Sequence, residues 1–206
     1  MKRLTLLGIL SLIVSLVFLS NRYAALTGEF IIDPSSQLRL EGVTNVNRFS
    51  CDCSDNFPKD TYELIQDNRP FIINLRNTDF RLATNKLDCG RKGINNDLRK
   101  ALKADSFPFI RIEVQTIRLP EGAGEISSTA WTEIPVKTQI TIAGTRRPLH
   151  LSVEAKALGD DYYQLRSRTE VAMSDFGIDP PRPMFGMIKV EDVITIHFDL
   201  KVHLLT

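Results

Sequence analysis

Strict alternation of apolar and polar side chains recurs along most of the chain. It is clearest near the C-terminal end, where every second position is apolar: Ile194, Ile196, Phe198, Leu200 and Val202. Residues 110–114, 136–142 and 149–155 alternate in the same way, and shorter runs lie at residues 38–41 and 48–53. Because successive side chains of a strand point to opposite faces, each run predicts a β-strand with one apolar face.

One segment departs from this alternation. Apolar residues at helical spacing predict a single short helix over residues 94–104: Ile94, Leu98, Ala101 and Leu102. Turn residues separate the strands, and hairpins are predicted at residues 143–145 and 159–161. Many one-sided strands with short connections indicate an all-β fold, either a sandwich or a barrel. The single inserted helix suits a barrel that it plugs or caps.

The N-terminal segment has the layout of a secretory signal. A pair of cations precedes residues 4–20, an apolar run without a charge. The candidate cleavage sites are poor, because Arg22 or Tyr23 stands where a small residue is preferred. Residues 1–30 are expected to be either a removed signal peptide or a retained membrane anchor, followed by one domain over residues 31–206. Both alternatives place that domain outside the cytoplasmic membrane, either periplasmic or secreted.

Composition and charge narrow the classes of function. Hydrophobic residues make up 43% and charged residues 25% of the chain, a balance typical of a folded domain. Lys and Arg number 26 against 25 Asp and Glu, and no run of like charges occurs. A nucleic-acid partner is therefore not expected.

The chain has three cysteines: Cys51, Cys53 and Cys89. In an oxidising compartment, Cys89 is expected to form a disulfide with Cys51 or Cys53, and the pattern leaves the choice open. Buried thiols are the alternative. No metal site is expected, because the histidines that would complete a ligand set lie far away in the sequence.

No motif in the sequence requires catalysis. His150, His197 and His203 all fall on the polar sides of their predicted strands. No His-Glu-x-x-His and no Gly-x-Ser-x-Gly motif occurs, and the glycines of residues 121–124 lack the rest of a phosphate loop. The sequence therefore indicates a protein that is not an enzyme and that has no cofactor.

The apolar faces of the strands define the interior of the predicted barrel. A barrel of about eight strands either fills with its own side chains or leaves room for one small ligand. Alternation alone favours the filled core.

Four stretches of sequence resemble a known family. Residues 175–178 read Asp-Phe-Gly-Ile and precede a glycine-led segment before the last strand, and residues 140–146 read Ile-Thr-Ile-Ala-Gly-Thr-Arg. Residues 96–112 combine Asn-Asp-Leu with Phe-Pro-x-Ile-x-Ile, and residues 42–49 form an opening Gly-Val-Thr-Asn-Val-Asn-Arg-Phe. In this order, across residues 36–204, the chain resembles the YceI-like family.

The resemblance implies an antiparallel closed β-barrel, lipocalin-like, of about eight strands with one short inserted helix. It also implies a long-chain lipid or isoprenoid ligand in the lumen. The tentative lining positions are the inward apolar residues: Leu38, Leu40, Phe49, Ile110, Ile112, Ile140, Ile142, Leu165, Phe176, Ile196 and Phe198. The family's early His-Ser pair is Ser35-Ser36 here, and its opening His and Trp are Asn47 and Phe49. These departures leave the ligand's head group open.

Two interpretations from different classes follow. The leading one is an exported binding protein that holds a polyisoprenoid, an isoprenoid quinone or a fatty-acyl lipid. The alternative is a non-enzymatic structural or interaction protein of the envelope with a filled barrel, and a thiol enzyme is a third. Two further interactions stay open: a tether to the membrane through residues 4–20, and a homodimer with a second copy of the chain.

Overall fold

Strands make up most of the chain that the structure describes. The computed structural model describes residues 26–53, 57, 59–65, 69–121 and 125–205. The strands are β1 (Leu26–Ile32), β2 (Gln37–Thr44), β3 (Arg48–Cys53), β4 (Asp60–Ile65), β5 (Ile72–Arg76), β6 (Phe80–Ala83), β7 (Leu87–Asp88), β8 (Phe109–Arg118), β9 (Thr132–Ile142), β10 (Thr145–Gly159), β11 (Tyr162–Ala172) and β12 (Val190–Leu205). One α-helix, α2 (Lys92–Ala101), and three short 3-10 helices complete the described elements: η1 (Thr84–Lys86), η2 (Met173–Phe176) and η3 (Met184–Gly186).

The N-terminal expectation lies almost wholly outside the described residues, which begin at Leu26. Strand β1 starts at that residue, ahead of the domain boundary expected at residue 31. Within the described ranges, no helix is long and apolar enough to cross a membrane.

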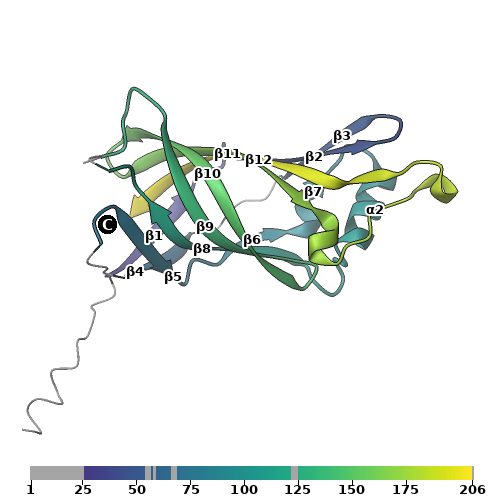
Figure 1. Cartoon of the computed structure of the whole chain (residues 1–206), viewed down its shortest axis with the longest axis horizontal. Helices are drawn as coiled ribbons and strands as arrows, with labels where there is room; N and C mark the ends of the chain where they lie inside the picture. Colours follow the sequence, from purple (N-terminus) through teal and green to yellow (C-terminus); the bar gives the residue numbers. More distant parts are fainter. Residues whose placement is uncertain (1–25, 54–56, 58, 66–68, 122–124, 206) are drawn as a thin grey trace, which may run out of the picture.

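Eight antiparallel strands close into a ring. Their order is β1-β4-β5-β8-β9-β10-β11-β12, and β12 pairs back onto β1. This arrangement confirms the prediction of a closed antiparallel barrel with one short helix. The helix predicted over residues 94–104 is α2, which lies at one end of the barrel beside β7 (Figure 1). The barrel therefore has two distinct ends, and we call this one the α2 end.

Two long strands change partner halfway along their length. The C-terminal part of β12 pairs with β1, and its N-terminal part pairs with β2. Likewise the C-terminal part of β8 pairs with β5, and its N-terminal part pairs with β6. At the α2 end the sheet thus continues with a different set of strands, β2, β3, β7 and β6 (Figure 1).

Where the partners change, hydrogen bonds from neighbouring loops pair with backbone groups of β12 and β8. On β12, the Lys201 amide donates to the Ser36 hydroxyl over 2.9 Å, and its carbonyl accepts from the Asp33 amide over 2.8 Å. On β8, the Thr78 hydroxyl donates to the Val114 carbonyl over 2.7 Å. These bonds matter because a backbone polar group left unpaired in a buried place costs free energy.

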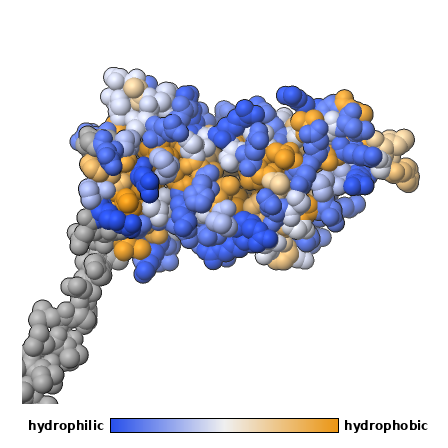
Figure 2. Space-filling view, in the orientation of Figure 1, coloured by the Kyte–Doolittle hydropathy of each residue, from blue (hydrophilic) through white to orange (hydrophobic). Residues whose placement is uncertain are grey.

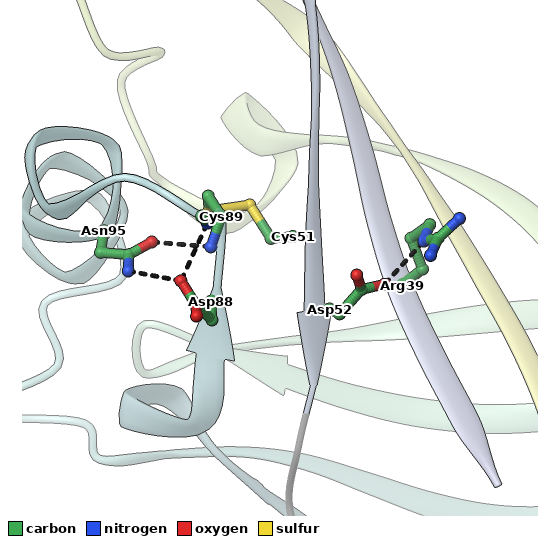
Figure 3. The surroundings of a disulfide bond; sticks show 7 residues. Arg39, Cys51, Asp52, Asp88, Cys89 and Asn95 are labelled. Carbon is green, nitrogen blue, oxygen red and sulfur yellow. Dashed lines mark hydrogen bonds and ion pairs between the residues drawn. A yellow bond between two sulfur atoms is a disulfide. The ribbon is translucent and has the colours of Figure 1, made fainter.

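A short contact closes the α2 end. Strand β7 pairs with β3 through two residue pairs, Asp52↔Asp88 and Cys53↔Leu87. Beside this contact a disulfide joins Cys51 to Cys89, one of the two partners left open by the sequence (Figure 3). Through η1 the same segment continues back to β6 and so to β8. The ring at this end is therefore closed partly by hydrogen bonds and partly by covalent linkage.

Helix α2 is fixed directly after the disulfide. The Asn95 side chain accepts from the Cys89 amide and donates to the Asp88 carboxylate, each over 2.7 Å (Figure 3). The hydrogen bond from Asn95 holds the pKa of the Asp88 carboxyl below its usual value. Leu98, on the apolar side of the helix, packs against the core.

A cluster of buried hydrophobic residues lies at the α2 end. Its buried members come from several strands, from the segment after α2 and from the loop after η2: Leu38, Leu82, Leu87, Leu102, Ile110, Ile140, Ile142, Ala143, Phe176 and Ile178. The β9–β10 hairpin predicted at residues 143–145 is present, with Ala143 and Gly144 both at positive φ. A Cβ at Gly144 would lie 2.5 Å from the Phe107 ring, so this position needs glycine for both reasons.

The first prediction concerns the covalent closure. Cys89→Ser should lower the free energy of unfolding of the oxidised protein by about 2–4 kcal/mol, because a cross-link restricts the unfolded chain. Reductant should lower the melting temperature of wild type to that of the variant and leave the variant unchanged.

Two matched variants test which thiols are paired. Cys51→Ser should lose sensitivity to reductant, as Cys89→Ser does, whereas Cys53→Ser should keep it. Retained sensitivity in Cys51→Ser would show that the pairing is wrong.

The second prediction concerns the partner change on β8. Thr78→Val keeps the side-chain shape but leaves the Val114 carbonyl without its hydroxyl donor, so it should cost about 1–2 kcal/mol in chemical denaturation. Thr141→Val on the outer face of β9 is the control and should change stability by less than about 0.5 kcal/mol. Equal effects of the two variants would contradict a specific role for Thr78.

Candidate ligand cavity

An apolar cavity of about 460 Å³ lies inside the α2 end. Strands β2, β3, β6, β8, β9, β11 and β12 supply its walls, α2 covers one side, and the loop between η2 and β12 borders it. The cavity is possible because β8 and β12 leave the eight-stranded ring here and pair with β6 and β2 instead.

Most of the lining positions predicted from alternation line this cavity: Leu38, Leu40, Phe49, Ile110, Ile112, Ile140, Ile142, Phe176 and Ile196. Their strand registers explain this, since Ile196 lies opposite Leu40 and Ile112 lies opposite Ile140. Paired residues point to the same face of a sheet, so these side chains meet on the inside.

Two predicted positions, Leu165 and Phe198, do not line the cavity. Phe198 pairs with Leu38 and so shares the inward face, but it lies further along β12. Leu165 pairs with Ala155 and Leu200, in the half of the barrel away from α2. Alternation gives the face of a strand correctly but not the depth at which the barrel becomes hollow.

Sequence reasoning missed the lining residues that lie outside the strands. Helix α2 contributes Ile94, Leu98 and Ala101, and the residues around η2 and η3 contribute a second group: Met173, Ile178, Pro181, Pro183, Met184 and Ile188. The helical periodicity of residues 94–102 was a usable signal for the first group. For the second group the sequence gives no such signal, because the prolines alone indicate only a stiff loop.

The Asp-Phe-Gly-Ile motif inserts two side chains into the wall. Residue Phe176 is the last residue of η2, and the left-handed Gly177 (φ 65°) turns the chain so that Ile178 is buried beside it. The Asp192 carboxylate on β12 accepts from the Ser174 amide over 2.8 Å and from its hydroxyl. These bonds lower the pKa of Asp192 and anchor η2 to the barrel.

Four polar residues lie among the apolar lining. Thr44 and Asn47, in the β2–β3 turn, bond to each other, with the Asn47 amide donating to the Thr44 hydroxyl over 2.9 Å. Arg91 and Asp97, at the start of α2 and on it, have side chains without a hydrogen-bond or ion-pair partner within the described part of the chain. These four side chains can therefore meet a polar group of a ligand, while the apolar remainder of the lining can only exclude water.

The three histidines are elsewhere. His197 lies 3.1 Å from the Glu41 carboxylate on the outer face of β12, His203 packs edge-on against Tyr162, and His150 is exposed. Across residues 26–205, excluding the gaps, no group of His, Cys, Asp and Glu is arranged to hold a metal ion.

A closed antiparallel barrel that is hollow at one end is a lipocalin-like architecture. The chain belongs to the YceI-like family, whose YceI-like domain model matches residues 65–202. No curated protein sequence matches the chain.

Solved structures share the fold at low sequence identity. Burkholderia cenocepacia BcnA is 15% identical with a TM-score of 0.60, over 85% of this chain and 99% of that one. A polyisoprenoid binding domain from Saccharophagus degradans, implicated in plant cell wall breakdown, is 10% identical with a TM-score of 0.62, over 84% and 97% of the two chains. At these identities the likeness extends to the fold alone.

Proposed function

We propose that this protein binds a long-chain apolar ligand, of the polyisoprenoid, isoprenoid quinone or fatty-acyl type, inside the α2 end of the barrel. The observation that carries this proposal is the cavity of about 460 Å³ with an apolar wall. Its volume lies within the range of small-molecule sites, about 300–1,000 Å³. The membership of the YceI-like family and the polyisoprenoid-binding description of the Saccharophagus degradans domain support the same class of ligand.

The distribution of polarity in the cavity orients the ligand. An apolar chain lies against Ile112, Ile140 and Ile196, where removal from water is the driving force. Its polar end lies toward Arg91 and Asp97, whose charged groups have no other partner in the described part of the chain. A ligand with one long apolar chain and a small polar head fits this arrangement.

The remaining expectations belong to the same proposal. The protein works as a binding protein without a catalytic step, in the periplasm or secreted, with residues 4–20 as a removed signal or a membrane tether. The apolar cavity favours this proposal over the alternative of a filled barrel, which predicts no such space.

Native mass spectrometry of the protein purified from its own membranes tests the ligand. The expected result is a bound lipid that denaturation releases. For the ligand-free protein, a series of single-chain probes should bind about three- to fourfold more tightly per added methylene, since each buried methylene contributes about 0.8 kcal/mol, until the cavity is full. Ligand-free protein with no chain-length dependence would contradict the proposal.

A cavity-filling variant tests the site. Ile196→Trp puts an indole into the lumen and should abolish uptake of the probes. Thr195→Trp, one position along β12 and on the opposite face, is the matched control and should leave uptake unchanged. Circular dichroism shows whether both variants keep the barrel. Full uptake by Ile196→Trp would place the ligand elsewhere.

A further inference from the structure

A second apolar feature lies on the outside of the α2 end. We call it the apolar tip. It consists of four highly exposed side chains: Val46 (64% exposed), Met184 (59%), Phe185 (106%) and Met187 (65%). Val46 lies in the turn between β2 and β3, and the other three lie in or beside η3. Figure 2 shows pale orange side chains projecting from this end of the molecule.

Hydrogen bonds hold the two loops of the apolar tip together. The Asn45 side chain donates to the Met187 carbonyl over 3.0 Å and accepts from the Lys189 amide over 2.8 Å. The Asn45 amide also donates to the Lys189 carbonyl over 3.1 Å. The two loops of the tip are therefore held together by hydrogen bonds, although they are far apart in the sequence.

The backbone presents the tip at a conformational cost. Met184 and Phe185 are consecutive non-glycine residues with φ of 56° and 55°. This left-handed region is unfavourable for residues with a Cβ, and most of all for bulky ones. These two strained residues expose their side chains, although methionine and phenylalanine are ordinarily buried in a folded protein. Strain combined with apolar exposure points to an interaction surface.

The charged residues within the two loops of the tip are all cations. Arg48, Arg182 and Lys189 are exposed, and residues 43–49 and 182–189 contain no Asp or Glu. None of these three cations pairs with a carboxylate of the described chain. Exposed apolar side chains with unpaired cations in the same loops match the interface of a bilayer with anionic lipids, where the apolar groups enter the acyl region and the cations meet phosphates.

The tip is continuous with the edge of the cavity. Met184 belongs to both, and Pro183, Ile188 and Asn47 line the cavity directly behind it. We propose that the apolar tip inserts into the surface of an anionic lipid membrane and sets the cavity against the bilayer. This contact does not depend on what the cavity holds, and it can be measured without following ligand uptake.

A site-specific fluorescence experiment tests the contact in the full chain. Trp131 is the only tryptophan, so Trp131→Phe with Phe185→Trp creates a single reporter at the tip. The vesicles contain equal amounts of phosphatidylcholine and phosphatidylglycerol with brominated acyl chains, which quench an inserted indole. We expect a blue shift and loss of most of the emission at position 185, both weakened by salt and by Arg182→Ser with Lys189→Ser.

The matched control separates the tip from an N-terminal tether. Trp131→Phe with Leu158→Trp places the reporter in the β10–β11 hairpin, at the other end of the barrel, where Leu158 is also exposed. This reporter should not be quenched. Three results would each overturn the proposal: quenching at position 158 alone, vesicle-bound protein without quenching at 185, or a concentration-dependent blue shift at 185 without lipid, which would assign the tip to a second copy.

Discussion

The structure depends on how the backbone of β8 and β12 is satisfied where these strands exchange partners. A closed sheet pairs every strand edge, and a strand that leaves its neighbour exposes amides and carbonyls. Here the Thr78 hydroxyl pairs with the Val114 carbonyl of β8, and Ser36 and Asp33 pair with both backbone groups of Lys201 on β12. One barrel can therefore contain two differently closed halves.

The α2 end, which contains the cavity, is closed by only a few contacts. Two residue pairs between β3 and β7, the Cys51–Cys89 disulfide and the turn at η1 replace a full strand-to-strand contact. In η1, the Thr84 amide and hydroxyl both donate to the Pro108 carbonyl, which ties the turn to the residue before β8. Helix α2 follows immediately and forms the cover of the cavity. The interior is thus left free for a ligand, while its walls are fixed from several directions.

The sequence predicts the faces of strands much better than the places where they diverge. Alternation is a local property, so Ile112, Ile140 and Ile196 could be assigned to the interior from their neighbours alone. Whether such a residue meets a cavity or a filled core depends on partner exchange between strands far apart in the chain, which is why Leu165 and Phe198 were placed in the lining and lie outside it. The same limit applies to the loop around η3, because nothing in residues 180–188 encodes its return to Asn45.

The pairing of β1 with β12 has a consequence for how this protein is made. Glu29 lies opposite Leu205, so the first described strand completes its hydrogen bonds only with the last described strand. Contacts of such long sequence separation make folding slow, and they cannot form before β12 has been synthesised. Until the C-terminal strand is released, both β1 and β11 keep an open edge. The ring therefore closes only as the last step of folding, when β12 takes its place between β11 and β1.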